Sequence, residues 1–318
     1  MKPFKTLEQQ IEILEARGLV ITDYDKTKHY LLQHSYYNVI NVYSKFFQEK
    51  ENNYISGSTF DEIRAVHIFD TEIKSVLFKY LLECEKHFKS ILAYRFSEYH
   101  RDIPYAYLKT TSYVDDNLLS LTSTISQMSR IISTNLKDKE PNLIKHYNNN
   151  HRDVPLWILI KHLTFGQSVH LFLHLDNKLK NIIAIDLARY LKENVGTKIV
   201  IEPKEIENML FNLIAVRNCV AHNNKLFSFR CRNHLKYHDA IHNKYNLKKQ
   251  QSRQDVFNVI LSMQCFLEKR QYCLLYNTIL KRARRLNGKL SSVPINTILG
   301  TLGFPNNWIT TTKKIVQA

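Results

Sequence analysis

A long run of residues without a helix breaker limits the folds that this chain can adopt. Residues 60–96, FDEIRAVHIFDTEIKSVLFKYLLECEKHFKSILAYRF, contain neither glycine nor proline, and Ser58 or Thr59 stands before them as a helix cap. The whole chain of 318 residues has only seven Gly and seven Pro, and 44% of its residues are hydrophobic. Few strands and few tight turns are therefore expected. The run predicts one long helix as the spine of an all-α, multi-helix bundle.

Hydrophobic periodicity and helix breakers predict further helices around this spine. Gly18 ends the first of them, and Pro203 occupies the first helical position of a later one. The predicted helices cover residues 6–17, 26–47, 115–134, 155–175 with a break near Gly166, 203–222 and 254–285. The predicted loops are residues 48–58, the stretch around Pro104 and residues 137–155. We expect an N-terminal helical segment at 1–57 that packs as one unit with an all-α region at 58–318.

The cysteines argue against a disulfide framework. They are five in number and contain no CxxC pair: Cys84, Cys219, Cys231, Cys265 and Cys273. A reducing compartment fits this usage best. The first residues, MKPFKTLEQQIEILEARG, lack a signal-peptide pattern, and no apolar run reaches membrane-spanning length. We expect a cytoplasmic protein with no membrane partner.

Positive charge is concentrated in the last part of the chain. The formal net charge is +16. Residues 1–200 carry 26 Lys and Arg against 23 Asp and Glu, whereas residues 201–318 carry 19 against 6. This asymmetry is typical of proteins with a polyanionic partner such as a nucleic acid. A solvated basic surface is the alternative. Membrane binding is disfavoured, because the KRARR cluster at 281–285 has no lipid-facing stripe beside it.

Two stretches share the spacing RxxxxH. One is RNCVAH, from Arg217 to His222, and the other is RFSEYH, from Arg95 to His100. With 15 Arg and 14 His in the chain, chance alone gives roughly one such match, so the spacing by itself proves nothing. RFSEYH lies at the far end of the spine, outside the basic part, and is assigned a structural role.

The surroundings of RNCVAH favour it as the functional stretch. A predicted apolar stripe on its helix consists of Ile206, Leu210, Leu213, Arg217 and Ala221. This pattern predicts a guanidinium on the buried face, which is unfavourable without a partner or an anionic ligand. Asn223 and Asn224 are natural helix terminators, so His222 is expected in the last turn.

Other candidate sites are weaker. HLKYHDAIH places His234, His238 and His242 four residues apart, which suits one helical face and a metal site, but no HExxH motif occurs. A histidine stripe that faces solvent or RNA is preferred. Cys219 is expected to pack and not to act as a nucleophile. Neither GxxxxGK[ST] nor GxGxxG occurs, so nucleotide chemistry has no support and no cofactor or metal is expected.

Five stretches of the chain occur in a characteristic order. They are LLQHSYYNVINVYSKFF, GSTFDEIRAVHIFDTEIKSVLFKYLLECEKHFKSILAYRF, PLWILIKHLTFGQSVHLFLHL, LIAVRNCVAHNNKLF and LGFPNNW. Together they resemble the Abi-like (abortive infection, AbiD/AbiF type) bacterial proteins, a family assigned to the HEPN group of all-α domains. In that group an RxxxxH motif often marks a metal-independent ribonuclease. The resemblance implies an HEPN-type helical bundle with an N-terminal extension, phage defence by RNA damage and, in some members, an associated small noncoding RNA.

By this resemblance the family's arginine, polar neighbour and histidine fall on Arg217, Asn218 and His222. The family often reads Cys-Ala-His, whereas Val220 intervenes here, and the motif positions are kept. We expect the surrounding basic part of the chain to contact RNA. The residues expected to do so are Asn223, Lys225, Arg230, Arg232, Lys281, Arg282, Arg284 and Arg285.

RNA supplies its own nucleophile, the 2′-hydroxyl, so cleavage requires a base, an acid and positive charge at the phosphate. Histidine suits the first two roles and arginine the third. On an ideal helix Arg217 and His222 lie about 140° apart with a rise of about 7.5 Å, so one helix aims them poorly at one phosphate. A homodimer that brings two motif helices together is therefore expected. The alternative is a noncatalytic RNA-binding scaffold that associates with a small noncoding RNA or a partner protein.

Overall fold

The computed structural model describes residues 3–114 and 117–316. Its longest element is helix α4 (Phe60–Tyr99), which confirms the predicted spine. Thr59 and Glu62 start this helix with a capping box, in which the Thr59 hydroxyl accepts from the Glu62 N–H at 3.2 Å and the Glu62 carboxylate accepts from the Thr59 N–H at 3.0 Å. The only sheet in the described ranges has two short strands. The predicted all-α class is confirmed.

The chain before the spine is divided more finely than predicted. Its elements are α1 (Leu7–Ala16), α2 (Tyr24–His34), α3 (Tyr36–Tyr43), η1 (Ser44–Phe47), β1 (Gln48–Lys50) and β2 (Asn53–Tyr54). The predicted helix at 26–47 is interrupted at Ser35, which has a φ of 61° and accepts a hydrogen bond from the Asn38 N–H to start α3. The predicted loop at 48–58 contains the two antiparallel strands.

Several short helices follow the spine. They are η2 (Ala106–Leu108), η3 (Thr110–Ser112), α5 (Leu118–Lys137), α6 (Leu143–His151), α7 (Leu156–Leu159), η4 (Ile160–His162), α8 (Phe165–Leu173) and α9 (Asn177–Val195). The loop predicted at 137–155 was wrong, because Asn142 caps a helix there. The break predicted near Gly166 is confirmed, and it falls at Thr164, whose capping box with Gln167 starts α8. The predicted start of α5, at residues 115 and 116, lies outside the described residues.

The basic part of the chain folds around the spine. Its elements are α10 (Pro203–Ala221), α11 (Asp239–His242), η5 (Asn243–Tyr245), α12 (Val256–Ser262), η6 (Met263–Cys265), α13 (Lys269–Asn287), α14 (Ile295–Thr301) and α15 (Trp308–Thr311). Pro203 begins its helix as predicted. The single helix predicted at 254–285 is wrong, because Glu268 and Gln271 form a new capping box that starts α13.

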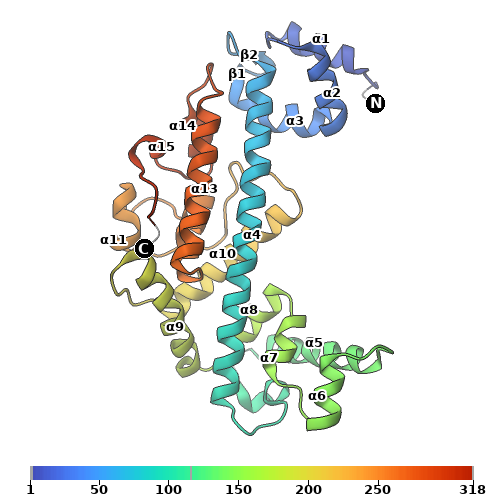
Figure 1. Ribbon diagram of the computed structural model, residues 1–318, viewed down its shortest axis with the longest axis vertical. Coiled ribbons are helices and arrows are strands. Elements are labelled where there is room, and N and C mark those ends of the chain that lie inside the picture. Colours follow the sequence, from blue (N-terminus) through green and yellow to red (C-terminus); the bar gives the residue numbers. More distant parts are fainter. Residues whose placement is uncertain (1–2, 115–116, 317–318) are drawn as a thin grey trace.

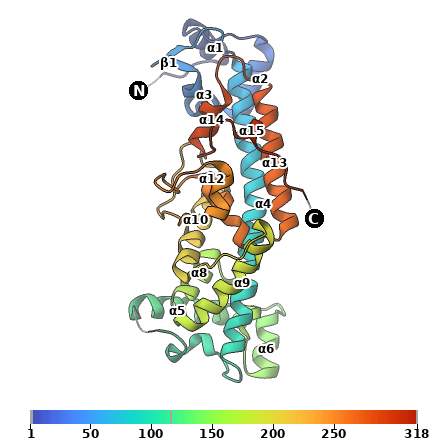
Figure 2. The same cartoon turned by 90° about the vertical axis from the view of Figure 1, so that its left-hand side faces the viewer.

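Helix α4 runs along the length of the molecule, and the other helices are arranged along it (Figures 1 and 2). One end lies beside α1 to α3, and the other end lies beside α5 to α7 (Figures 1 and 2). Helices α10 and α13 pack against its middle. The core between α13 and the tail includes fully buried aromatic rings, among which Trp308 donates to the Tyr276 hydroxyl at 2.9 Å. All five cysteines are free and buried. In the described part of the chain no helix combines the length and apolar character needed to cross a membrane.

A half-buried histidine, His67, and a buried one, His242, should make this fold sensitive to acid. Burial lowers the pKa of His67 and of His242 from 6.5 to about 4. Between these values the unfolded chain binds protons that the folded chain does not, so stability falls as the pH falls through this window. Because one pKa unit corresponds to about 1.4 kcal/mol, moving from about pH 7 to about pH 5 should lower the free energy of unfolding by about 2 kcal/mol for each ring. Urea unfolding at both pH values measures this loss, and His242→Gln should reduce it by about 2 kcal/mol.

Candidate functional site

The RNCVAH stretch forms the last turn of α10 and its C-cap. His222 is the cap residue, and its N–H donates to the Asn218 carbonyl at 3.1 Å. Asn223 adopts a left-handed φ of 53°. The N–H groups of Asn223 and Asn224 donate to the carbonyls of Val220 (3.1 Å) and Cys219 (2.9 Å), which is the Schellman pattern of a helix end. The predicted termination at the two asparagines is confirmed.

The buried face of α10 differs from the predicted stripe. Ile206, Leu210 and Leu213 are fully buried, as predicted. The stripe then continues through other residues, and Ala221 is exposed. Arg217 is half-buried at the edge of this face, so the prediction of a buried arginine is corrected to a partly buried one. The residues that continue the stripe are Val216 and Val220, three and seven positions after Leu213, as a helical period requires.

The Arg217 side chain reaches into a groove between α4 and α7. Its Nη1 donates to the Asn218 Oδ1 at 3.2 Å, and its Nε is buried without a hydrogen-bond partner. We call this cavity of about 770 Å³ the α4–α7 groove. Its lining residues are Leu82, Glu85, Lys86, His87, Lys89, Ser90, Ala93, Tyr94, Trp157, Ile160, Lys161 and Arg217. Arg217 therefore keeps donors available at an open cavity.

The arginine of the second RxxxxH stretch has the opposite environment. Arg95 donates from Nε and Nη2 to the Asp186 carboxylate at 2.5 and 3.0 Å, and from Nη1 to Glu98 at 2.6 Å. The hydrogen bonds that Arg95 donates to Asp186 and Glu98 raise the pKa of Arg95. All three nitrogens of this guanidinium are occupied. This arginine holds α9 against α4, in agreement with its predicted structural role.

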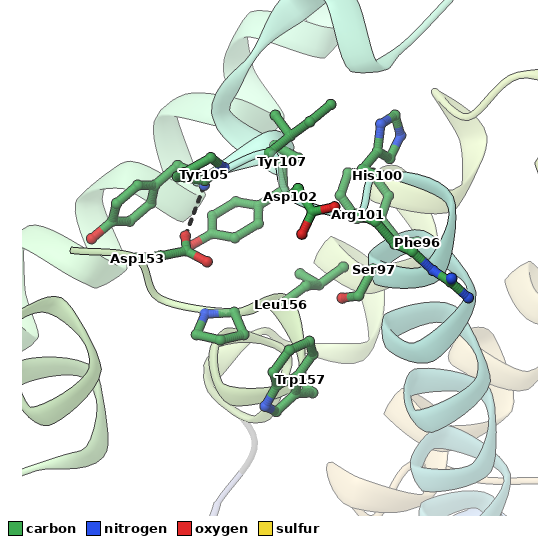
Figure 3. Close-up of a pocket in the computed structure, with 14 residues that line it drawn as sticks. Phe96, Ser97, His100, Arg101, Asp102, Tyr105, Tyr107, Asp153, Leu156 and Trp157 are labelled. Atoms are coloured by element: carbon green, nitrogen blue, oxygen red, sulfur yellow. Dashed lines mark hydrogen bonds between the residues drawn. The ribbon is translucent and has the colours of Figure 1, made fainter. Parts of the chain in front are cut away.

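His100, the histidine of that stretch, lies beside a separate small pocket. Figure 3 shows its ring above this cavity of about 290 Å³, at the end of α4. The ring packs on Phe96 at a centroid distance of 4.5 Å, and burial lowers its pKa. Across the pocket the Tyr105 N–H donates to Asp153 at 2.8 Å. Arg95 and His100 therefore do not form a shared open site.

A buried polar chain supports the end of the RNCVAH helix. The Lys74 ammonium donates to Oδ1 and to the backbone carbonyl of Asn223 at 3.2 and 3.4 Å. It also pairs with Asp70 at 2.5 Å, and the Tyr43 hydroxyl donates to Asp70 at 2.7 Å. The exposed fractions of the Lys74 and Asp70 side chains are only 8% and 1%. These buried polar contacts were not predicted from the sequence. An Asp and a Lys four residues apart on a buried helical face are the pattern that could have indicated them.

The predicted histidine stripe is wrong. The helix there, α11, begins only at Asp239, so His234 and His238 precede it. His238 pairs with the Glu205 carboxylate at 2.6 Å, and His242 is buried. Within residues 3–114 and 117–316, no three His, Cys, Asp or Glu side chains are grouped as a metal site would require.

The basic residues expected to contact RNA differ in their partners within the protein. Arg282 and Arg285 both pair with Glu72, at 2.9 and 3.4 Å. Arg284 donates to the carbonyls of Ile309 and Thr312, both at 2.9 Å, and therefore holds the C-terminal tail. Arg230 similarly donates to the Phe229 and Thr301 carbonyls. Three further basic side chains are exposed and have no hydrogen-bond or ion-pair partner in the described residues: Lys225, Arg232 and Lys281.

Cys219 is buried in the same turn as the motif. Its thiol lies 3.6 Å from the Lys225 carbonyl, and burial raises its pKa to about 11. A thiolate is therefore disfavoured at neutral pH. This environment supports the expectation that Cys219 packs.

One comparison with known proteins finds a match. The model of the family described as Abi-like protein matches residues 29–228, which is more than half of the chain. The match includes all of α4 and α10 and the RNCVAH stretch, whereas the fifth resembling stretch, LGFPNNW at 302–308, lies beyond it. Neither the curated proteins nor the solved structures give a match. The chain belongs to the Abi-like protein family.

Proposed function

We propose that this protein is a metal-independent endoribonuclease that acts in abortive infection, a form of phage defence. Membership of the Abi-like family supports the role in abortive infection. The proposed chemistry uses the RNCVAH stretch, with Arg217, Asn218 and His222 as the catalytic residues. The net positive charge of residues 201–318 suits a polyanionic substrate.

The observation that carries this proposal is the contrast between the two RxxxxH arginines. Arg95 has its three nitrogens occupied by Asp186 and Glu98. In the ranges that the structure describes, Arg217 has no ion-pair partner and bonds only to the neutral Asn218 amide. A half-buried guanidinium without a carboxylate partner can bind a phosphate, which accepts two parallel hydrogen bonds from arginine.

The residues around Arg217 suit the steps of RNA cleavage. An imidazole such as His222, exposed at the helix end, can take the proton of the 2′-hydroxyl as that oxygen attacks phosphorus. The imidazolium of His222 from a second copy of the chain then donates a proton to the departing 5′-oxygen. Arg217 stabilises the extra negative charge on the phosphate oxygens. Asn218 holds the Arg217 guanidinium through its side-chain oxygen.

Incubation of the purified protein with total RNA in EDTA tests the proposal. Attack by the 2′-hydroxyl requires no metal, so cleavage should continue in EDTA. The products should end in 2′,3′-cyclic phosphate and 5′-hydroxyl groups. Cleavage that vanishes with EDTA, or intact RNA under all conditions, would remove the support for this mechanism.

One feature favours a second function, an RNA-binding scaffold without catalysis. In the described part of the chain no side chain is hydrogen-bonded to the His222 imidazole, whereas catalytic histidines are usually oriented by a neighbour. A scaffold that holds a small noncoding RNA needs only the basic surface. Sequencing of RNA that copurifies with the protein, together with the EDTA assay, separates the two functions.

The proposed mechanism requires a dimer. His222 caps α10 five positions after Arg217, so each chain presents the two side chains in different directions. The solution mass should be twice the chain mass of 37.6 kDa. Mixing the Arg217→Ala and His222→Ala variants should restore part of the cleavage, because the mixed dimer keeps one of each residue. A monomer that still cleaves RNA would contradict a shared site.

RNA affinity should depend steeply on salt, because each phosphate contact releases counterions. The basic residues without partners in the protein are the ones expected to contribute to this salt dependence. Replacing the exposed Lys225, Arg232 and Lys281 by Gln should reduce the slope of log K against log salt by about 2 for a single strand. Arg284→Gln is the control, since this arginine holds tail carbonyls and should leave the slope unchanged. An unchanged slope in the triple variant would identify these cations as a merely solvated surface.

A further inference from the structure

The α4–α7 groove combines apolar walls with unusual exposure of large side chains. Trp157 is 50% exposed, Tyr94 61% and Leu82 40%. Ala93 and Ile160 complete the apolar lining. The volume of about 770 Å³ lies in the range of about 300–1,000 Å³ that small-molecule sites occupy. Apolar surface gathered in one cavity indicates a binding site.

The charges at the groove are predominantly positive. Lys86, Lys161 and Arg217 line it, and Lys86 also lies 3.7 Å from Glu83, which is outside the lining. The remaining pair of charges is neutralised internally, because Lys89 binds Glu85 at 2.6 Å. A ligand that complements this groove therefore has a flat apolar body attached to negative charge. Nucleotides of RNA have both properties.

We propose that the α4–α7 groove binds an unpaired nucleobase of an RNA strand, stacked on Trp157, while Lys86, Lys161 and Arg217 contact the flanking phosphates. This inference rests on the proposed action on RNA and adds a substrate class, single-stranded RNA. Every base has a π-face that stacks on an aromatic side chain, and bases within a duplex are not accessible in this way. Arg217 links base binding in the groove to the proposed cleavage, since it lines the groove and belongs to the RNCVAH stretch.

Helix α7 is the element that presents the stacking ring. It follows Pro155 and packs against α4 (Figure 1). Trp157, in its first turn, lines both the α4–α7 groove and the pocket beside His100 (Figure 3). The indole therefore stands between two cavities, and a ring with open space around it can accept a base.

Tryptophan fluorescence provides a direct test, because the chain has two tryptophans. Trp308 is 1% exposed and donates to Tyr276, so only Trp157 is accessible to a ligand. The His222→Ala protein is titrated with three probes of equal length: a single-stranded oligoribonucleotide, an abasic oligonucleotide and an RNA duplex. We expect quenching by the single strand alone, although the abasic strand carries the same phosphates.

Two variants test whether the fluorescence quenching comes from a base stacked on Trp157. Trp157→Phe should retain affinity for the single strand and lose the quenching. Trp157→Ala should weaken single-strand binding about tenfold, as loss of one stacked base requires, and should change abasic-strand binding less than twofold. The unchanged emission of Trp308 reports that each variant is folded.

The outcomes separate this inference from the proposed function. If the unaltered chain cleaves RNA, and Trp157→Ala and Tyr94→Ala bind the single strand normally, the groove inference is wrong while the proposed function stands. If Trp157 emission changes with protein concentration and not with RNA, a second copy of the chain occupies the groove, and the inference is again wrong. If no probe binds at all, the proposed action on RNA fails as well.

Discussion

Arg217→Ala and His222→Ala should each slow RNA cleavage by about a hundredfold or more. The first removes the guanidinium that stabilises charge on the phosphate, and the second removes the group that transfers protons. Initial rates on an end-labelled RNA in EDTA measure the loss. Arg217→Lys should be intermediate, because it keeps the charge but not the paired donors. His222 is exposed, so its replacement should change the free energy of unfolding by less than about 0.5 kcal/mol.

The second RxxxxH stretch is the internal control. His100→Ala should leave cleavage intact, because His100 lies at a separate pocket. Arg95→Lys is a better control than Arg95→Ala, since alanine removes the two donors that bind the Asp186 carboxylate, 11% exposed, and leaves it only the exposed Arg189 at 3.4 Å. Cleavage that survives in the His222 variant but is lost with His100 would show that the functional stretch had been misassigned.

Lys74→Met should lower the free energy of unfolding by about 3–5 kcal/mol, the usual cost of leaving one charge of a buried pair alone. Asp70 is 1% exposed, and burial already raises its pKa. The double variant Asp70→Asn/Lys74→Met removes both charges and should recover most of the stability. Urea unfolding of the single and double variants measures the difference. A single variant within about 1 kcal/mol of the unaltered protein would mean that the pair contributes little.

The double variant also isolates the effect of Lys74 on the site. Lys74 binds the side chain and the carbonyl of Asn223, the residue after His222. A folded protein without this contact should show slower cleavage with unchanged RNA affinity, because the helix end that carries His222 is held less firmly. Equal cleavage rates in the double variant and the unaltered protein would restrict Lys74 to a role in stability.

The elements that could be predicted from the sequence are those whose signals are local. The absence of Gly and Pro from residues 60–96 and the cap at Thr59 predicted α4, and Asn223 and Asn224 predicted the end of α10. Caps and breakers act through residues up to about four positions away, so they can be read from the chain. The single helices predicted at 26–47 and 254–285 were wrong because the caps at Ser35 and Glu268 lie within otherwise helical patterns.

Which RxxxxH arginine has available donors depends on contacts between distant parts of the chain. Arg95 is occupied because Asp186, 91 residues away, lies against it, and Asn223 is held by Lys74 from 149 residues away. The α4–α7 groove likewise joins α4, α7 and α10. No spacing in the sequence predicts such contacts, because ion pairs and cavities form between surfaces that meet only when the helices pack. The two stretches are equivalent as patterns, and their different partners after packing distinguish them.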